Sequence, residues 1–118
     1  MRIFRKGYEI TLNRVHDYIV IREGEERLPL TVDGDAQRMV VGLNKAREKM
    51  AAMKDETSDE DVLETAKYFA SVIFGNEQAA KLMEFYNNDP GCVISVCGQY
   101  FRNRLAEKIA KVQRKMKL

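Results

Sequence analysis

Residues 58–76 read SDEDVLETAKYFASVIFGN, and this stretch carries the signals of one complete helix. Its apolar residues recur at steps of three and four, which places them on one helical face: Val62, Leu63, Ala66, Phe69, Ala70, Ile73 and Phe74. Thr57 with Glu60, or Ser58 with Asp61, has capping-box spacing at the start. Gly75 follows where a left-handed C-cap is usual. The stretch therefore predicts a helix that ends at a Phe-Gly pair.

Two further helices are predicted downstream of Gly75. Asn76 can cap a short helix, whose buried positions would be Ala79, Leu82, Met83 and Tyr86. The breaker Asn87–Gly91 separates it from a long last helix from Pro90 to Lys115, with Pro90 suited to the first turn. One apolar stripe is expected to run along that helix: Ile94, Cys97, Phe101, Leu105, Ile109, Val112 and Met116.

The last helix has two different halves. In the first half, Val93, Val96 and Tyr100 form a second apolar line, so this part is hydrophobic nearly all round. Such a segment is either central in the core or covered by another molecule. The second half is basic outside the stripe: Arg102, Arg104, Lys108, Lys111, Arg114, Lys115 and Lys117 stand against the single acid Glu107. Positive residues favour a helix C-terminus, which is the plainer interpretation, although they could also bind phosphates.

Upstream, residues 35–53 predict another amphipathic helix. Its apolar face would hold Ala36, Met39, Val40, Leu43, Ala46, Met50 and Met53. Within Asp33-Gly34-Asp35, which ends the strand region, either aspartate can cap this helix. Five of the six methionines lie on predicted apolar faces, where flexible side chains serve either as core filler or as an adaptable surface for a partner.

The N-terminal third predicts β-structure. Tyr18–Arg22 and Arg27–Val32 are rich in β-branched and aromatic residues and flank Glu23–Glu26, which makes them a hairpin candidate. Tyr8–Leu12, together with Ile3-Phe4, could add a third strand. We therefore expect an α+β fold, mostly α, with a small N-terminal antiparallel β-hairpin or sheet in residues 1–33 and about four helices in residues 34–118.

The chain's 118 residues suit one domain, 1–118. Its 20 basic and 18 acidic residues give a net charge of +2, so charge alone makes no case for nucleic acid. The sequence has no apolar run of the length a membrane span needs, and residues 1–6 lead into no signal-type apolar block. We expect a cytoplasmic protein.

The sequence signals for catalytic, metal and cofactor sites are weak, and we predict no such site. The only histidine, His16, has no nucleophile motif near it, and the glycines form no phosphate-binding pattern. Cys92 and Cys97 would lie about 8 to 9 Å apart on a helix, which is too far for a disulfide. The acidic groups at 33–35 and 59–61 sit where helix capping explains them, and the cysteines and His16 cannot make a four-ligand zinc site.

The stretch SVIFGNE at Ser71–Glu77, followed by KLMEFY at Lys81–Tyr86, resembles the tail assembly chaperones of long-tailed phages and prophages. The resemblance covers roughly residues 18–118. It implies a β element before a helical domain, no catalytic residues, and binding to the tape measure protein, a long hydrophobic polypeptide around which tail tube subunits polymerise. The tail tube protein and a second copy of the chain are further candidate partners. The extra residues before Tyr18 and the basic final turns match nothing in the family.

The predicted partner-binding residues are Phe85, Val93, Val96 and Tyr100, which a hydrophobic helix of the tape measure protein would cover. The alternative function is a small nucleic-acid-binding or regulatory protein that acts through Arg102–Lys117. No aromatic residue follows Phe101, so that segment has no platform on which bases could stack. Nucleic acid is therefore the less favoured partner.

Overall fold

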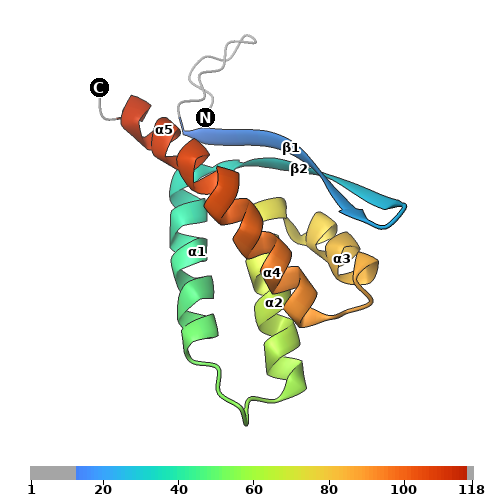
Figure 1. Ribbon diagram of the computed structural model, residues 1–118. Coiled ribbons are helices and arrows are strands. Elements are labelled where there is room, and N and C mark those ends of the chain that lie inside the picture. The colour runs from blue at the N-terminus through green and yellow to red at the C-terminus, as the bar shows by residue number, and fades with distance from the viewer. Residues whose placement is uncertain (1–12, 117–118) are drawn as a thin grey trace.

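The computed structural model describes residues 13–116 and confirms the α+β, mostly α, fold class. A two-stranded antiparallel hairpin lies across one end of a group of helices (Figure 1). The elements are β1 (Arg14–Glu23), β2 (Glu26–Asp35), α1 (Ala36–Ala51), α2 (Asp59–Phe74), α3 (Asn76–Phe85), α4 (Pro90–Tyr100), the π-helical turn η1 (Phe101–Leu105) and α5 (Ala106–Met116). The strand predicted from Tyr8–Leu12 and Ile3-Phe4 lies outside the described residues.

The predicted hairpin is confirmed, and its strands are longer than expected. Glu23 pairs with Glu26 across the two-residue turn at Gly24, whose φ of +62° favours glycine. Pairing continues to Asp35, so the strand does not stop at residue 32. The carboxylate of Asp35 then accepts a 2.9 Å hydrogen bond from the Arg38 N–H, which caps α1 as predicted.

The outer edge of β2 is closed by a side chain of α3. In this register Pro29 and Thr31 both turn their backbone nitrogens away from β1, and Pro29 has no N–H to offer. The Thr31 N–H donates to Gln78 Oε1 at 2.8 Å, and Gln78 Nε2 donates to the Thr31 carbonyl at 2.7 Å. The Gln78 amide thus takes the place of a neighbouring strand at this position.

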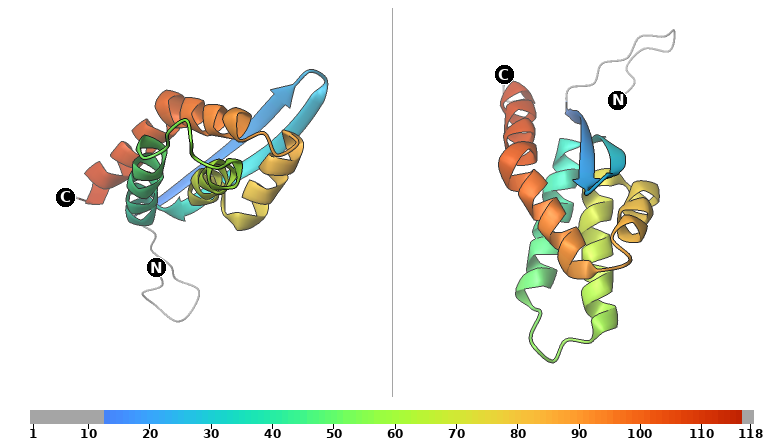
Figure 2. Two further views of the ribbon diagram at one scale, coloured as in Figure 1. Left: turned by 90° about the horizontal axis from the view of Figure 1, so that it is seen from below. Right: turned by 45° about the vertical axis from the view of Figure 1, so that its right-hand side comes forward.

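The predicted helix at residues 58–76 packs between the other elements (Figure 2). Of the two possible caps, Ser58 accepts the Asp61 N–H at 3.2 Å, while the Thr57 hydroxyl accepts the Lys54 N–H at 2.8 Å and closes the preceding turn. A β-carbon at Gly42 of α1 would lie 2.8 Å from the Val72 side chain, so α1 and α2 approach closely there. The last helix packs against both α1 and α2.

Gly75 alone connects α2 to α3. Its φ of +86° and ψ of 161° lie in a region that is nearly restricted to glycine, with positive φ as predicted but an extended ψ. Asn76 was expected to cap α3, and that prediction is wrong. Because the connection is a single residue, Asn76 is already the first residue of the helix, and no side chain caps it.

The C-terminal helix is continuous but changes its winding once. Asp89 caps α4 through a 3.3 Å hydrogen bond from the Cys92 N–H, and Pro90 occupies the first turn as expected. At η1 the Ala106 N–H bonds to the Phe101 carbonyl, five residues back. The extra residue rotates everything after it by about 100° relative to a regular helix. The chain therefore presents different faces to the core before and after η1.

This rotation corrects the predicted single apolar stripe. The buried residues of the C-terminal helix are Val93, Cys97 and Tyr100 before the turn, Leu105 at its last position and Ile109 after it. Ile94 and Phe101, which the regular stripe placed in the core, are only partly buried. The side chain of Met116, the last member of the predicted stripe, is outside the described residues.

The core is shared by the hairpin and all the helices. It includes Val15, Leu30 and Val32 from the sheet, Met39 and Ala46 from α1, Phe69, Ile73 and Phe74 from α2, and Leu82 and Met83 from α3. Both predicted regions thus contribute to one hydrophobic cluster. Between residues 13 and 116 no helix combines the length and apolar character of a membrane span.

Replacing Gly75 with alanine should destabilise the fold by about 1–3 kcal/mol, because a β-carbon is strained at this backbone conformation. Apart from the two neighbouring residues, no atom lies within 4 Å of where the β-carbon would be, so the loss would be conformational rather than steric. Gly91→Ala is the control, since Gly91 is exposed in the first turn of α4 and lacks a positive φ. Urea unfolding should separate the two variants, and equal stability would contradict this account.

Candidate functional site

Two of the predicted partner-binding residues belong to the core. Val93 is fully buried and Tyr100 is 8% exposed, because the first half of the last helix packs against α2. For Val93 and Tyr100, packing within the chain explains why the first half of the last helix is apolar on nearly all sides. Val96 and Phe85 are partly buried, and the Phe85 ring lies edge-on to Tyr86 at a centroid distance of 5.1 Å. Val93 and Tyr100 therefore leave almost no side-chain surface for a partner to contact.

An apolar groove lies elsewhere, between α1 and the C-terminal helix. The last helix lies against α1 at α5 and diverges from it towards α4 (Figure 1). The resulting groove has a volume of about 440 Å³, and Phe69 of α2 lies at its base. Its apolar lining is completed by Leu43 and Met50 from α1 and by Ile94 and Phe101 from the last helix. All four are partly buried, so each keeps apolar surface that residues 13–116 leave uncovered.

The groove continues towards α5. A second hollow of about 140 Å³ shares Leu43, Asn44 and Phe101 with the first and adds Val40 and Ile109. From Val40 to Met50 the helical rise gives the combined groove a length of about 15 Å. That length accommodates about ten residues of a partner helix. Such a helix would place side chains in the groove at positions i, i+3 or i+4, and i+7.

The charged groups that line the groove are both arginines. Arg47 projects from α1 and Arg102 from η1. Arg47 Nη2 donates to its helix neighbour Asn44 Oδ1 at 3.1 Å, and within residues 13–116 neither guanidinium has a carboxylate within ion-pair distance. The Arg102 guanidinium lies over Gly98, with Nη1 3.1 Å from where a β-carbon would be. Glycine at this position provides the space for that side chain.

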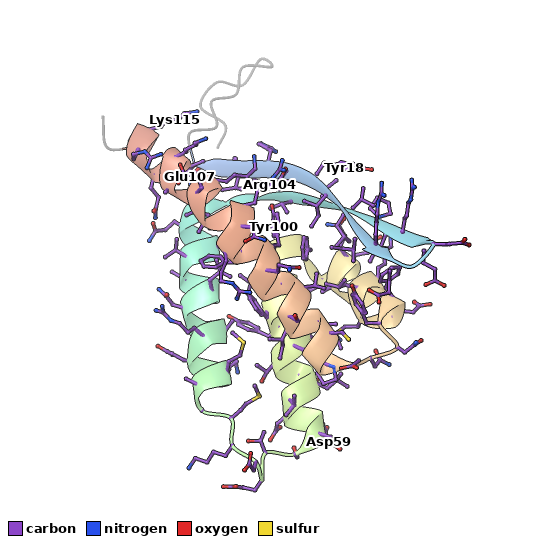
Figure 3. The ribbon with its side chains drawn as sticks, viewed as in Figure 1. Tyr18, Asp59, Tyr100, Arg104, Glu107 and Lys115 are labelled. Carbon is purple, nitrogen blue, oxygen red and sulfur yellow. The ribbon has the colours of Figure 1, made fainter. Side chains whose placement is uncertain are left out.

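A buried carboxylate positions the helix that forms one wall of the groove. Asp17 lies on the inner face of β1 with its side chain only 4% exposed. Tyr100 Oη donates to it at 2.7 Å, and Arg104 donates from Nε at 2.7 Å and from Nη2 at 2.9 Å. The Tyr18 N–H adds a bond of 2.8 Å, and Lys108 Nζ lies 3.9 Å away. Figure 3 shows Tyr100 and Arg104 together on the C-terminal helix, while Tyr18 projects from the hairpin.

These contacts keep the carboxylate ionised. Burial opposes ionisation of Asp17, but the hydrogen bonds from Tyr100, Arg104 and the Tyr18 N–H outweigh it and hold the pKa below its usual value. On the other side of the contact, burial and the hydrogen bond to Asp17 raise the pKa of Tyr100. Tyr100 therefore stays a neutral donor and Asp17 a charged acceptor throughout the neutral pH range.

The Asp17 contact was missed in the sequence, although a signal for it exists. Val15, Ile19 and Ile21 alternate on the inner face of β1, and Asp17 occupies an inward position of the same series. A charge in an apolar alternation must be paired when buried. The contact also gives Arg104 a structural role, because it holds the hairpin to the last helix. The basic turns are thus not one uniform solvent-facing surface.

Other polar groups do not assemble into a site. Burial raises the pKa of the Cys97 thiol to about 12, so it is a poor nucleophile, and both cysteines are free. His16 is exposed, with Nδ1 3.4 Å from the Asp33 carboxylate. In the described part of the chain no three histidine, cysteine or acidic side chains come together in a way that could hold a metal ion.

Comparison with known proteins gives no match to this chain among protein-family models, curated proteins or solved structures.

Asp17→Asn should destabilise the protein by about 2 kcal/mol at neutral pH, since it removes charged acceptors from two hydrogen-bond donors. A carboxylate with a lowered folded-state pKa contributes stability above its unfolded value of 3.8, and that contribution disappears as pH falls through the folded value. The difference between wild type and Asp17→Asn should therefore shrink below about pH 4. Urea midpoints at pH 7 and at about pH 2.5 measure it.

Asp33→Asn is the matched control, because Asp33 pairs with Arg14 on the surface and its side chain is 57% exposed. Its effect at neutral pH should stay within about 1 kcal/mol. An Asp17→Asn variant no less stable than Asp33→Asn would show that the Asp17 contact does not hold the hairpin.

Proposed function

We propose that this protein is a tail assembly chaperone of a long-tailed phage or prophage, a non-enzymatic protein that binds the hydrophobic tape measure protein and keeps it soluble while tail tube subunits assemble. Two considerations support the proposal. One is the resemblance of Ser71–Glu77 and Lys81–Tyr86 to that family. The other, which carries the proposal, is the apolar groove between α1 and the C-terminal helix.

The groove suits a helical hydrophobic ligand. Its length matches two to three helical turns, and its walls are aliphatic and aromatic side chains with uncovered surface. Met50 lies at one end, and a flexible thioether adapts to side chains of different shapes. A chaperone that meets many segments of one long polypeptide needs this tolerance. We therefore propose this groove as the partner-binding surface in place of the four predicted residues, since Val93 and Tyr100 are buried and Phe85 and Val96 do not line it.

The nucleic-acid alternative is less favoured by the geometry of the basic turns. Arg104 and Lys108 face Asp17, and Arg114 lies 3.3 Å from Glu107, so several cations there have carboxylate neighbours. Phosphate binding depends on cations that are available to neutralise the nucleic-acid backbone. Under the same proposal, a tail tube protein and a second copy of the chain are additional partner candidates.

Gene order offers the first test of the proposal. The gene for this chain should lie between one for a tail tube protein and one for a very long, apolar, helical protein. Finding neither neighbour in the sequenced source would remove the basis for a tail assembly role.

The second test targets the groove. Met50→Gln combined with Ile94→Gln makes two walls polar without adding charge, and the soluble yield of a co-expressed tape measure protein should fall about tenfold or more. The double variant should still fold, because both side chains are only partly buried. Pull-down of the tape measure protein and its soluble fraction give the measurement.

Val41→Gln is the matched control, since Val41 is on the same helix as Met50 but is 47% exposed and lies outside the groove. It should leave the yield unchanged. Full activity of the groove variant, or equal loss in both variants, would place the binding surface elsewhere.

A further inference from the structure

The two arginines of the groove are its most specific feature. Both side chains are exposed in the free protein, so their guanidinium groups stay hydrated until a ligand covers the groove. A ligand that removes this hydration binds favourably when it supplies an anion to each guanidinium. In residues 13–116 no carboxylate lines this groove or lies within ion-pair distance of Arg47 or Arg102. The groove therefore presents two cations without presenting the anions that would complement them.

Arg102 is placed in the groove by the backbone itself. Arg102 follows Phe101 in the π-helical turn, and Gly98, four residues earlier, leaves room for its guanidinium. Arg47 approaches from α1, on the opposite wall. A helix lying in the groove would thus meet one guanidinium on each of its two flanks, with the apolar side chains between them.

We propose that the groove selects amphipathic helical segments with carboxylates on both sides of an apolar stripe. This rests on the proposed function and defines which segments of the apolar partner polypeptide are bound. The charges supply orientation and specificity while the apolar contacts supply most of the affinity. A partner segment would carry two or three apolar residues at i, i+4 and i+7, flanked by glutamate or aspartate.

Fluorescently labelled helical peptides of about 14 residues provide the probe, since this length spans the groove. Three peptides share one leucine stripe and differ only in flanking residues, which are glutamate, glutamine or lysine. Fluorescence anisotropy with the intact protein should rank them in that order. The glutamate peptide should bind about tenfold more tightly than the lysine peptide at low salt, with a smaller ratio at high salt.

Charge reversal tests the assignment to Arg47 and Arg102. Arg47→Glu with Arg102→Glu should invert the ranking, so that the lysine peptide binds best. Lys111→Glu with Lys115→Glu is the control, because it changes the net charge equally at exposed positions of α5 outside the groove. The control should keep the original ranking. An equal loss of preference in both double variants would mean that general charge, and not the groove, decides.

The remaining outcomes separate this inference from the proposed function. Equal binding of all three peptides overturns the selection for carboxylates and leaves an apolar chaperone groove in place. Binding of none of them, while the tape measure protein still co-purifies, overturns the groove as a helix site but not the chaperone role. A dimer that the Arg47→Glu/Arg102→Glu variant dissociates in sedimentation would make the occupant a second copy of the chain and overturn the proposed partner.

Discussion

A single buried carboxylate determines how the two parts of this protein meet. Asp17 is on the inner face of a hairpin that otherwise presents aliphatic side chains to the helices, and it must find donors there. Tyr100 and Arg104 supply them from the last helix. The hairpin therefore cannot slide or rotate on the helices without leaving a charge unpaired. A non-directional hydrophobic contact alone would not impose this restriction.

The π-helical turn reconciles two requirements on the last helix. In a regular helix, Arg104 would follow Val93, Cys97 and Tyr100 on the buried face, and Leu105 would turn away from it. The inserted residue lets Leu105 and Ile109 continue into the core while Arg104 still reaches Asp17. Ile94 and Phe101 are left at the side, next to α1. The groove therefore results from a helix that both packs into the core and reaches the Asp17 carboxylate.

Local signals explain what could be predicted from the sequence. The hairpin around Gly24, the caps at Asp35 and Ser58 and the break at Gly75 each depend on residues within a few positions. The candidate site depends on distant ones, because Asp17 meets residues 83 and 87 positions later. A regular helical period applied to residues 90–115 placed Phe101 in the core and Tyr100 on a binding surface. Periodicity cannot show where a helix gains a residue when the reason lies in another element.

The closed edge of β2 limits how copies of this protein can associate through their sheets. With Gln78 occupying the Thr31 position and Pro29 lacking a donor, no strand can be added there. Any extension of the sheet has to occur at β1, and it ends after one copy because every copy carries the same blocked side. The hairpin could join in pairs but could not propagate as a ribbon.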